Sequence, residues 1–254
     1  MEAYSADRSL KGKLRRRWAR LVHRRPVRMR LDRPMVSFSF DDAPASAAEA
    51  GAALLEARGL TGTWFISMGL AGTEGPMGVN ADAGQIRRLL ARGHELACHT
   101  HSHLDCGQAD PEAMTRDVQS NLAALNALGV PDPVSFAYPY GDVSPAAKRT
   151  LGGRYGLLRG LHHGLIADGS DLNQAPGVGI EGADGEAVAT RWLDLALARK
   201  AWLILYTHDV GQTPSPFGCT PEALGGLIDR ALAGGAEVVS VAEGLRRIGA
   251  RAAG

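Results

Sequence analysis

Two aspartates and two histidines are the residues of this sequence whose types and spacing best suit metal binding and acid–base chemistry. His99 and His103 stand four residues apart, and on a turn of helix that spacing would place both imidazoles on one side. Asp41 and Asp42 are adjacent and directly follow an apolar stretch. Neighbouring carboxylates repel each other, and a cation relieves the repulsion if one carboxylate ligates it while the other stays free as a base.

Each pattern also has an ordinary explanation when taken alone. Histidine pairs at this spacing occur most often on surfaces or in cores, and acidic residues favour the start of a helix in any case. Together, one carboxylate and two imidazoles make a three-ligand site with open positions for water and substrate, as in catalytic rather than structural sites. Mixed nitrogen and oxygen ligands predict Zn²⁺, with Co²⁺ or Ni²⁺ as alternatives.

Three polar clusters follow the carboxyl ends of predicted strands. The aspartate pair follows residues 36–40, the histidines follow residues 95–98, and His208 with Asp209 follows residues 203–206. In a parallel α/β barrel the loops at that end of the strands converge on one face, so the three clusters are expected to share a site.

The elements that must position these clusters alternate along the chain. Apolar or β-branched runs of strand length alternate with helical stretches, which predicts a mostly parallel sheet with helices outside it. About seven strands suit a barrel, and we expect one α/β domain over residues 34–250. The expected strands are 35–40, 61–67, 95–98, 134–138, 155–158, 201–206 and 237–240, and the expected helices are 45–58, 85–92, 110–128, 145–151, 186–199, one from Thr220 and a last one to about Ile248.

The first 33 residues differ from the rest in charge. They carry 12 Lys or Arg against 3 acids, whereas the remaining chain holds 16 bases and 24 acids. Arginines interrupt every apolar run, so the segment resembles neither a secretory signal nor a membrane span. Apolar residues do recur at helical spacing, and two interpretations stay open: the helix docks this stripe on the domain, or residues 8–30 contact an anionic membrane surface. The stripe comprises Leu10, Leu14, Trp18 and Leu21 or Val22.

Two partner and location expectations follow from composition. No basic groove interleaved with aromatics is evident, so a nucleic-acid partner is not expected. Three cysteines are too few for a disulfide framework, and a reducing compartment is the default. We expect a cytoplasmic protein, with the inner membrane face as an alternative.

The ordered motifs of this chain resemble those of the polysaccharide deacetylases, the NodB-like family 4 carbohydrate esterases. The resemblance spans roughly Pro34 to Ile248 and leaves the basic segment outside. It rests on Ser39-Phe40-Asp41-Asp42, Gly93-His94-Glu95 with His99-Thr100-His101-Ser102-His103, Tyr138-Pro139-Tyr140-Gly141, and Leu205-Tyr206-Thr207-His208-Asp209.

The resemblance implies a distorted (β/α)7-type barrel and a role for each matching residue. Asp42, His99 and His103 would ligate the metal, and Asp41 would be the general base. Tyr140 would offer its backbone N–H to the oxyanion, and His208 would protonate the leaving amine. Pro139, Tyr140 and Gly141 would contact the substrate.

Two positions depart from the family pattern. Ala137 stands where the family usually has the arginine that orients the base. The fourth motif, an aspartate and a tryptophan flanking the acid histidine, has no clean match, and its weak candidates are Asp168, Asp171 and Trp192. Asp209 is a further candidate for orienting His208.

The four motifs and the resemblance that they carry imply a metal-dependent hydrolase that removes N-acetyl groups from GlcNAc-type residues of an oligo- or polysaccharide. Such an enzyme acts on a carbon–nitrogen bond other than a peptide bond, and its partner is the N-acetylated glycan. One alternative is a glycan O-acetyl esterase, in which an alkoxide needs less help from His208 to leave. Another is a non-catalytic glycan-binding or assembly protein on the same fold, which would have no need of the aspartate pair and two histidines.

Overall fold

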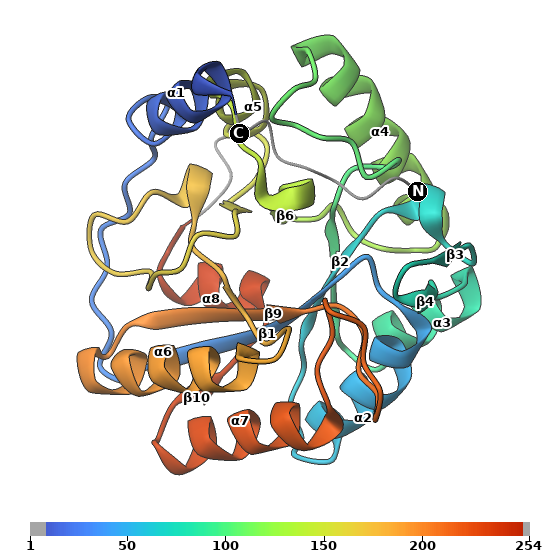
Figure 1. Ribbon diagram of the computed structural model, residues 1–254, viewed down its shortest axis with the longest axis vertical. Coiled ribbons are helices and arrows are strands. Elements are labelled where there is room, and N and C mark those ends of the chain that lie inside the picture. Colours follow the sequence, from blue (N-terminus) through green and yellow to red (C-terminus); the bar gives the residue numbers. More distant parts are fainter. Residues whose placement is uncertain (1–8, 251–254) are drawn as a thin grey trace.

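The computed structural model describes residues 9–250, and its centre is a curled sheet of parallel strands with helices around it (Figure 1). The strand order is β7-β6-β5-β2-β1-β9-β8, and β10 pairs with β1 beside this path. The strands are β1 (Met35–Asp41), β2 (Thr63–Ile66), β5 (Glu95–Cys98), β6 (Ser135–Ala137), β7 (Leu157–Arg159), β8 (Val178–Gly179), β9 (Trp202–Thr207) and β10 (Glu237–Val238).

Five helices of the body start at a residue whose side chain caps the first turn, including the starts expected at residue 110 and Thr220. Asp82, Asp110, Ser144, Thr220 and Ser240 each accept a backbone N–H of the first turn of the helix that follows. The helices are α1 (Leu10–Ala19), α2 (Ala52–Glu56), α3 (Ala83–Ala91), α4 (Pro111–Ala127), α5 (Pro145–Leu151), α6 (Gly185–Arg199), α7 (Pro221–Ala233) and α8 (Val241–Arg247).

The structure confirms the predicted α/β fold with a distorted barrel, which is a half-barrel, and it refines three expectations. The first body helix opens with a π-helical segment, Ala47–Gly51, before α2. The segment between the strand expected at 61–67 and the helix expected at 85–92 contains a short antiparallel pair, β3 (Glu74–Gly75) with β4 (Gly78–Val79). Strand β8 was not predicted, because two residues are too few for a hydrophobic period.

Strand β1 shows how the sheet positions a polar side chain inside the half-barrel. Every residue of β1 is buried, as expected for a central parallel strand. Val36, Phe38 and Phe40 belong to the core cluster beneath α2, α3, α6 and α7, whereas Met35 belongs to the inner cluster that α8 closes. Because side chains alternate along a strand, Asp41 shares the inner face with Met35 and emerges at its carboxyl end.

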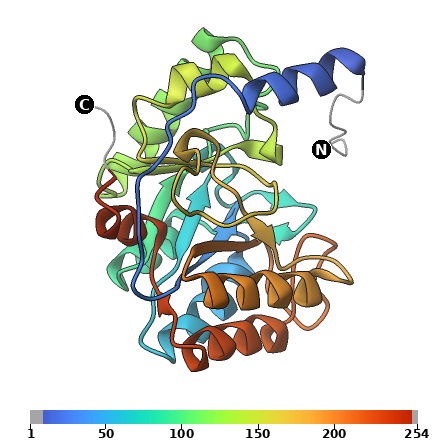
Figure 2. The same cartoon turned by 90° about the vertical axis from the view of Figure 1, so that its left-hand side faces the viewer.

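The basic N-terminal segment forms α1 and then an extended run along the body. In Figure 2, α1 lies at the top of the molecule on the side of α5, with α6 and α7 at the bottom. Within residues 9–250, no helix has the combination of length and apolar character that crossing a bilayer requires.

Candidate active site

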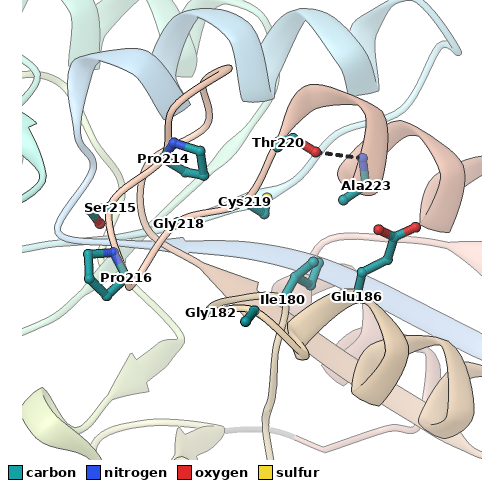
Figure 3. A pocket seen from close by; sticks show the side chains of 11 residues that line it. Ile180, Gly182, Glu186, Pro214, Ser215, Pro216, Gly218, Cys219, Thr220 and Ala223 are labelled. Carbon is teal, nitrogen blue, oxygen red and sulfur yellow. Dashed lines mark hydrogen bonds between the residues drawn. The ribbon is translucent and has the colours of Figure 1, made fainter.

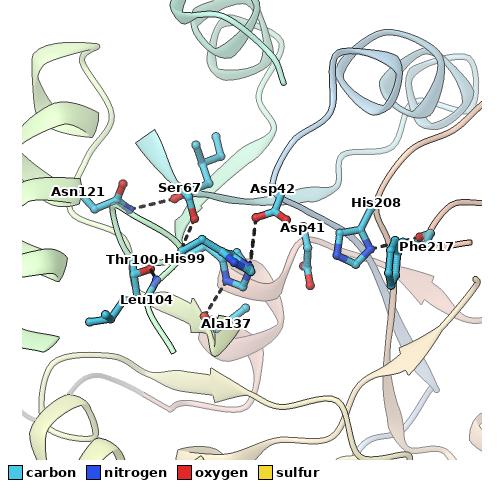
Figure 4. A network of polar contacts seen from close by, with 12 residues as sticks. Asp41, Asp42, Ser67, His99, Thr100, Leu104, Asn121, Ala137, His208 and Phe217 are labelled. Atoms are coloured by element: carbon cyan, nitrogen blue, oxygen red, sulfur yellow. Dashed lines mark hydrogen bonds and ion pairs between the residues drawn. The ribbon is translucent and has the colours of Figure 1, made fainter. Parts of the chain in front are cut away.

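The three polar clusters predicted from the sequence meet at the carboxyl ends of neighbouring strands (Figure 4). Asp41 is the last residue of β1, and Asp42 follows it. His99 directly follows β5, and His208 directly follows β9. Strands β5, β2, β1 and β9 are consecutive in the sheet, so the convergence follows from the parallel topology.

Asp42, His99 and His103 form a group suited to a metal ion. One ligand atom from each lies within 4.8 Å of the others. Asp42 Oδ1 is 3.5 Å from His103 Nε2 and 3.8 Å from His99 Nε2. That Oδ1 is buried and has no hydrogen-bond partner, which would be costly unless a cation completes it. The three residues therefore fit a divalent metal.

The second nitrogen of His99 fixes the direction of its ring. His99 Nδ1 lies 2.8 Å from the carbonyl oxygen of Ala137, so Nδ1 carries the proton and Nε2 faces Asp42 with its lone pair. Burial lowers the pKa of His99 to about 4, against the opposing effect of Asp41 and Asp42. The ring is neutral at neutral pH, as a metal ligand must be.

The histidine segment is a loop and not the helical turn that the four-residue spacing suggested. Thr100 and His103 both have a positive φ, 63° and 57°. Asp117 of α4 holds the loop by accepting the backbone N–H groups of His101 and Ser102. Tertiary contacts thus bring the two imidazoles together, with ring centroids 5.0 Å apart.

Strained backbone is concentrated at this site. Asp42 and Tyr140 also have positive φ values, 59° and 58°, although neither is glycine. Left-handed residues of this kind cost on the order of 1–3 kcal/mol each, and surrounding structure must hold them. Their position at the ends of β1 and β6 is typical of a functional site.

Asp41 forms a buried ion pair with Arg159 of β7. Nη2 of Arg159 lies 2.5 Å from both carboxylate oxygens, and the arginine side chain is fully buried between the rings of Phe65 and Tyr206. Burial raises the pKa of Asp41, but Arg159, His99 and His208 together hold it below its usual value. Asp41 is therefore ionised at neutral pH and able to accept a proton.

Arg159 stands next to Ala137, the position at which the resemblance predicts an arginine. In the parallel pair of β6 and β7, Ala137 and Arg159 are register partners. The guanidinium that the resemblance led us to expect at position 137 is thus replaced by one from the neighbouring strand. The sequence signal was a lone arginine ending the apolar run Leu157-Leu158, and we had not predicted its role.

Replacing Arg159 with methionine should destabilise the protein by about 3–5 kcal/mol, since Asp41 is left buried without its counter-charge. It should also raise the pKa of Asp41, so the acidic limb of the kcat/KM profile moves to higher pH. Urea unfolding measures the first effect, and Arg191→Met, at an exposed position of α6, is the matched control. The double variant Asp41→Asn/Arg159→Met should recover part of the lost stability, and failure to recover any would contradict the ion-pair explanation.

Glu181 is the acidic partner of His208. Glu181 Oε2 lies 3.3 Å from Nδ1 of His208, and this nitrogen is also 3.2 Å from the carbonyl oxygen of Phe217. Burial lowers the pKa of His208, but the hydrogen bond to Glu181 and the nearby Asp41 and Asp42 raise it to about 9. His208 is therefore protonated at neutral pH. The sequence did not point to Glu181, because it follows the two-residue strand β8.

The other residues that the sequence suggested as partners of His208 form different interactions. Asp209 accepts the backbone N–H and the hydroxyl of Ser215, so it fixes the following loop and does not orient His208. Asp171 pairs with buried Lys148, and Asp168 accepts the backbone N–H of Met29. Trp192 contacts the ring of His163.

The turn Pro139–Gly141 completes the rim of the site. Its Tyr140 ring packs edge-on against His103, with centroids 4.3 Å apart. A Cβ on Gly141, whose φ is 63°, would lie 2.4 Å from Leu161, so only glycine fits there. The turn is thereby held against the metal-ligand group.

A pocket opens beside the His208 loop (Figure 3). It lies between the segment after β8 and the loop that precedes α7, and Ile180, Gly182, Pro214 and Gly218 are among its lining residues. The same two segments contain Glu181 and Phe217, the contacts of His208. Phe217 is 48% exposed, so it offers an apolar ring face next to the site.

The protein is an α/β half-barrel, and a group of residues suited to a divalent metal ion lies at the carboxyl ends of its strands. The family profile described as polysaccharide deacetylase matches residues 28–157, half of the chain. The chain belongs to the polysaccharide deacetylase family. No curated protein sequence matches it.

Solved structures share the fold at low sequence identity. The Xyl-CE4 domain of a multidomain xylanase from the hindgut metagenome of Trinervitermes trinervoides has a TM-score of 0.61 and 20% identity, covering 88% of this chain and 95% of that one. The chitin deacetylase of Colletotrichum lindemuthianum has a TM-score of 0.60 and 17% identity, covering 86% and 92%. The family 4 acetyl xylan esterase of Clostridium thermocellum, in complex with cobalt, has a TM-score of 0.57 and 22% identity, covering 82% and 89%.

Proposed function

We propose that this chain hydrolyses the N-acetyl group of GlcNAc-type residues in an oligo- or polysaccharide, using a divalent metal held by Asp42, His99 and His103. The observation that carries the proposal is the presence of two separate ion pairs next to that group, one at Asp41 and one at His208 (Figure 4). Asp41 is ionised by Arg159, and His208 is kept protonated by Glu181. A base and an acid are thus both ready at neutral pH.

Asp41 is the general base of the proposed reaction. It takes a proton from the water that attacks the acetyl carbonyl, and Arg159 keeps its carboxylate in place. In this proposal the backbone N–H of Tyr140 donates a hydrogen bond to the oxyanion that develops on the carbonyl oxygen. A bound divalent ion, Zn²⁺ before Co²⁺ or Ni²⁺, would polarise the carbonyl and lower the pKa of the water.

His208 is the general acid. An amine leaves only after it gains a proton, and the imidazolium of His208 can supply that proton. An alcohol leaving group needs this help less, so the His208–Glu181 pair favours amide over ester hydrolysis.

A substrate panel tests the proposed function. Purified protein loaded with Zn²⁺ or Co²⁺ is incubated with N-acetylated chitooligosaccharides and, in parallel, with O-acetylated xylan, and released acetate is measured. We expect turnover of the amides. Turnover of the ester alone would identify an esterase, and no turnover of either substrate with metal bound would favour a binding protein.

Replacing Glu181 with glutamine should move the alkaline limb of the kcat/KM profile to lower pH. The protonated form of His208 is the active one, so activity is lost as pH rises through its pKa of about 9. Removing the Glu181 charge lowers that pKa, and loss begins earlier. Glu186→Gln, at an exposed position on α6, should leave the limb in place. An unmoved limb in Glu181→Gln would show that Glu181 does not tune the acid.

A further inference from the structure

Helix α1 turns its apolar residues toward solvent. Leu10, Leu14, Trp18 and, just beyond the helix, Leu21 are 79%, 65%, 58% and 69% exposed. We call these four residues the apolar stripe. They are half of the eight large exposed hydrophobic residues within the described part of the chain, so exposed apolar surface is concentrated here.

The opposite side of α1 holds the helix to the body. Gly12 and Ala19 are buried, and the carbonyl oxygen of Ala19 accepts a hydrogen bond from Lys148 Nζ at 2.7 Å. Arg15 pairs with Asp142 at 2.6 Å, and this carboxylate is only 2% exposed. The sequence left docking of the stripe open, but the helix docks through its small residues, and the stripe stays outside.

The charged residues in the sequence around the apolar stripe are all basic. Residues 8–30 contain eleven Lys or Arg and no Asp or Glu. Several are exposed next to the stripe or on the extended segment that follows α1, namely Lys13, Arg17, Arg20, Arg24, Arg28 and Arg30. A second copy of the chain seated on the stripe would bring these like charges together, which opposes dimerisation through this face.

We propose that α1 is an interfacial helix that binds the surface of an anionic lipid bilayer. The apolar stripe enters the boundary between headgroups and acyl chains, and the surrounding arginines contact anionic headgroups. Trp18 suits this depth, because its indole combines an apolar ring with a polar N–H. The body stays attached to the bound helix through Arg15 and Asp142.

Vesicle flotation of the full chain tests this binding. We expect the protein to float with phosphatidylglycerol-containing vesicles and not with pure phosphatidylcholine, and added salt should weaken the binding. Trp18 emission should shift to the blue, since the other three tryptophans, Trp64, Trp192 and Trp202, are buried or half-buried. Trp18→Phe should keep the binding and lose most of that shift.

Paired variants separate the two parts of the surface. Leu14→Glu/Trp18→Glu and Arg17→Glu/Arg20→Glu should each lower the vesicle partition coefficient by at least about tenfold. The controls Leu232→Glu on α7 and Arg87→Glu/Arg88→Glu on α3 change an exposed leucine and an exposed pair of arginines elsewhere and should leave it within about twofold. Acetate release from a soluble oligosaccharide should be unchanged in all four, which keeps this test independent of the proposed function.

Three results would overturn the proposal. One is absence of the wild-type chain from anionic vesicles at low salt. Another is full binding by Leu14→Glu/Trp18→Glu. The third is a dimer, seen by sedimentation, that this variant dissociates while vesicles are not bound, because a second copy would then cover the stripe.

Discussion

Asp41→Asn is expected to lower kcat by about 10²–10⁴-fold while the bound metal remains at the wild-type level. An amide cannot take the proton of the attacking water. The new amide oxygen still accepts a hydrogen bond from Arg159, so the side chain should keep its place at the end of β1. Acetate release measures the first effect, and metal content per chain measures the second.

The neighbouring Asp42→Asn is the matched control, because it changes the same chemical group one residue along. It should lose metal together with activity, whereas Asp41→Asn should lose activity alone. Circular dichroism and urea unfolding check that both variants are folded, since Arg159 loses its full counter-charge when Asp41 is neutral. If Asp41→Asn retained more than about a tenth of wild-type kcat, the general base would have to be another group.

A barrel and the convergence of the clusters could be predicted from the sequence because short stretches of the chain carry the signal. Strands β1, β5 and β9 are apolar runs whose polar successors stand directly at their ends. Parallel topology then brings the carboxyl ends to one face, whatever the details of packing. The positions of the aspartate pair, the two histidines and His208 therefore followed from pattern, whereas their individual roles were implied by the family resemblance.

The partners of Asp41 and His208 could not be predicted in the same way. Arg159 reaches Asp41 because β6 and β7 pair in a register that places it beside Ala137, and register is a property of the folded sheet. Glu181 follows a strand of two residues, too short to leave a hydrophobic period. Both were missed because their roles depend on long-range pairing.

The sequence pattern also could not predict the conformation of the histidine segment or the exposure of the apolar stripe. Four-residue spacing fits a helical turn, yet Asp117 holds the histidine segment as a loop in which Thr100 and His103 are left-handed. The periodicity of α1 defines an apolar stripe but not whether it is covered. Gly12 and Ala19, which permit a close approach to the body, decide that the opposite face docks.

Replacing a residue of the metal-ligand group should remove the metal and nearly all activity together. His99→Ala leaves Asp42 and His103, two ligands where a catalytic site uses three protein groups. Metal content measured after dialysis against trace Zn²⁺ should fall from about one ion per chain to near zero. Zn²⁺ should raise the melting temperature of the wild-type protein by mass action and should not raise that of the variant.

His101→Ala is the control for this effect, since it removes the same side chain from the same loop. His101 lies between the two ligands in sequence, but it is not part of the group whose ligand atoms converge. Its backbone N–H, not its ring, is held by Asp117, so the loop should persist in the variant. Equal loss of metal from both variants would mean that the loop and not the imidazole of His99 governs binding. Metal retained in His99→Ala would remove the basis for the three-ligand site, because the unpartnered oxygen of Asp42 would then need another explanation.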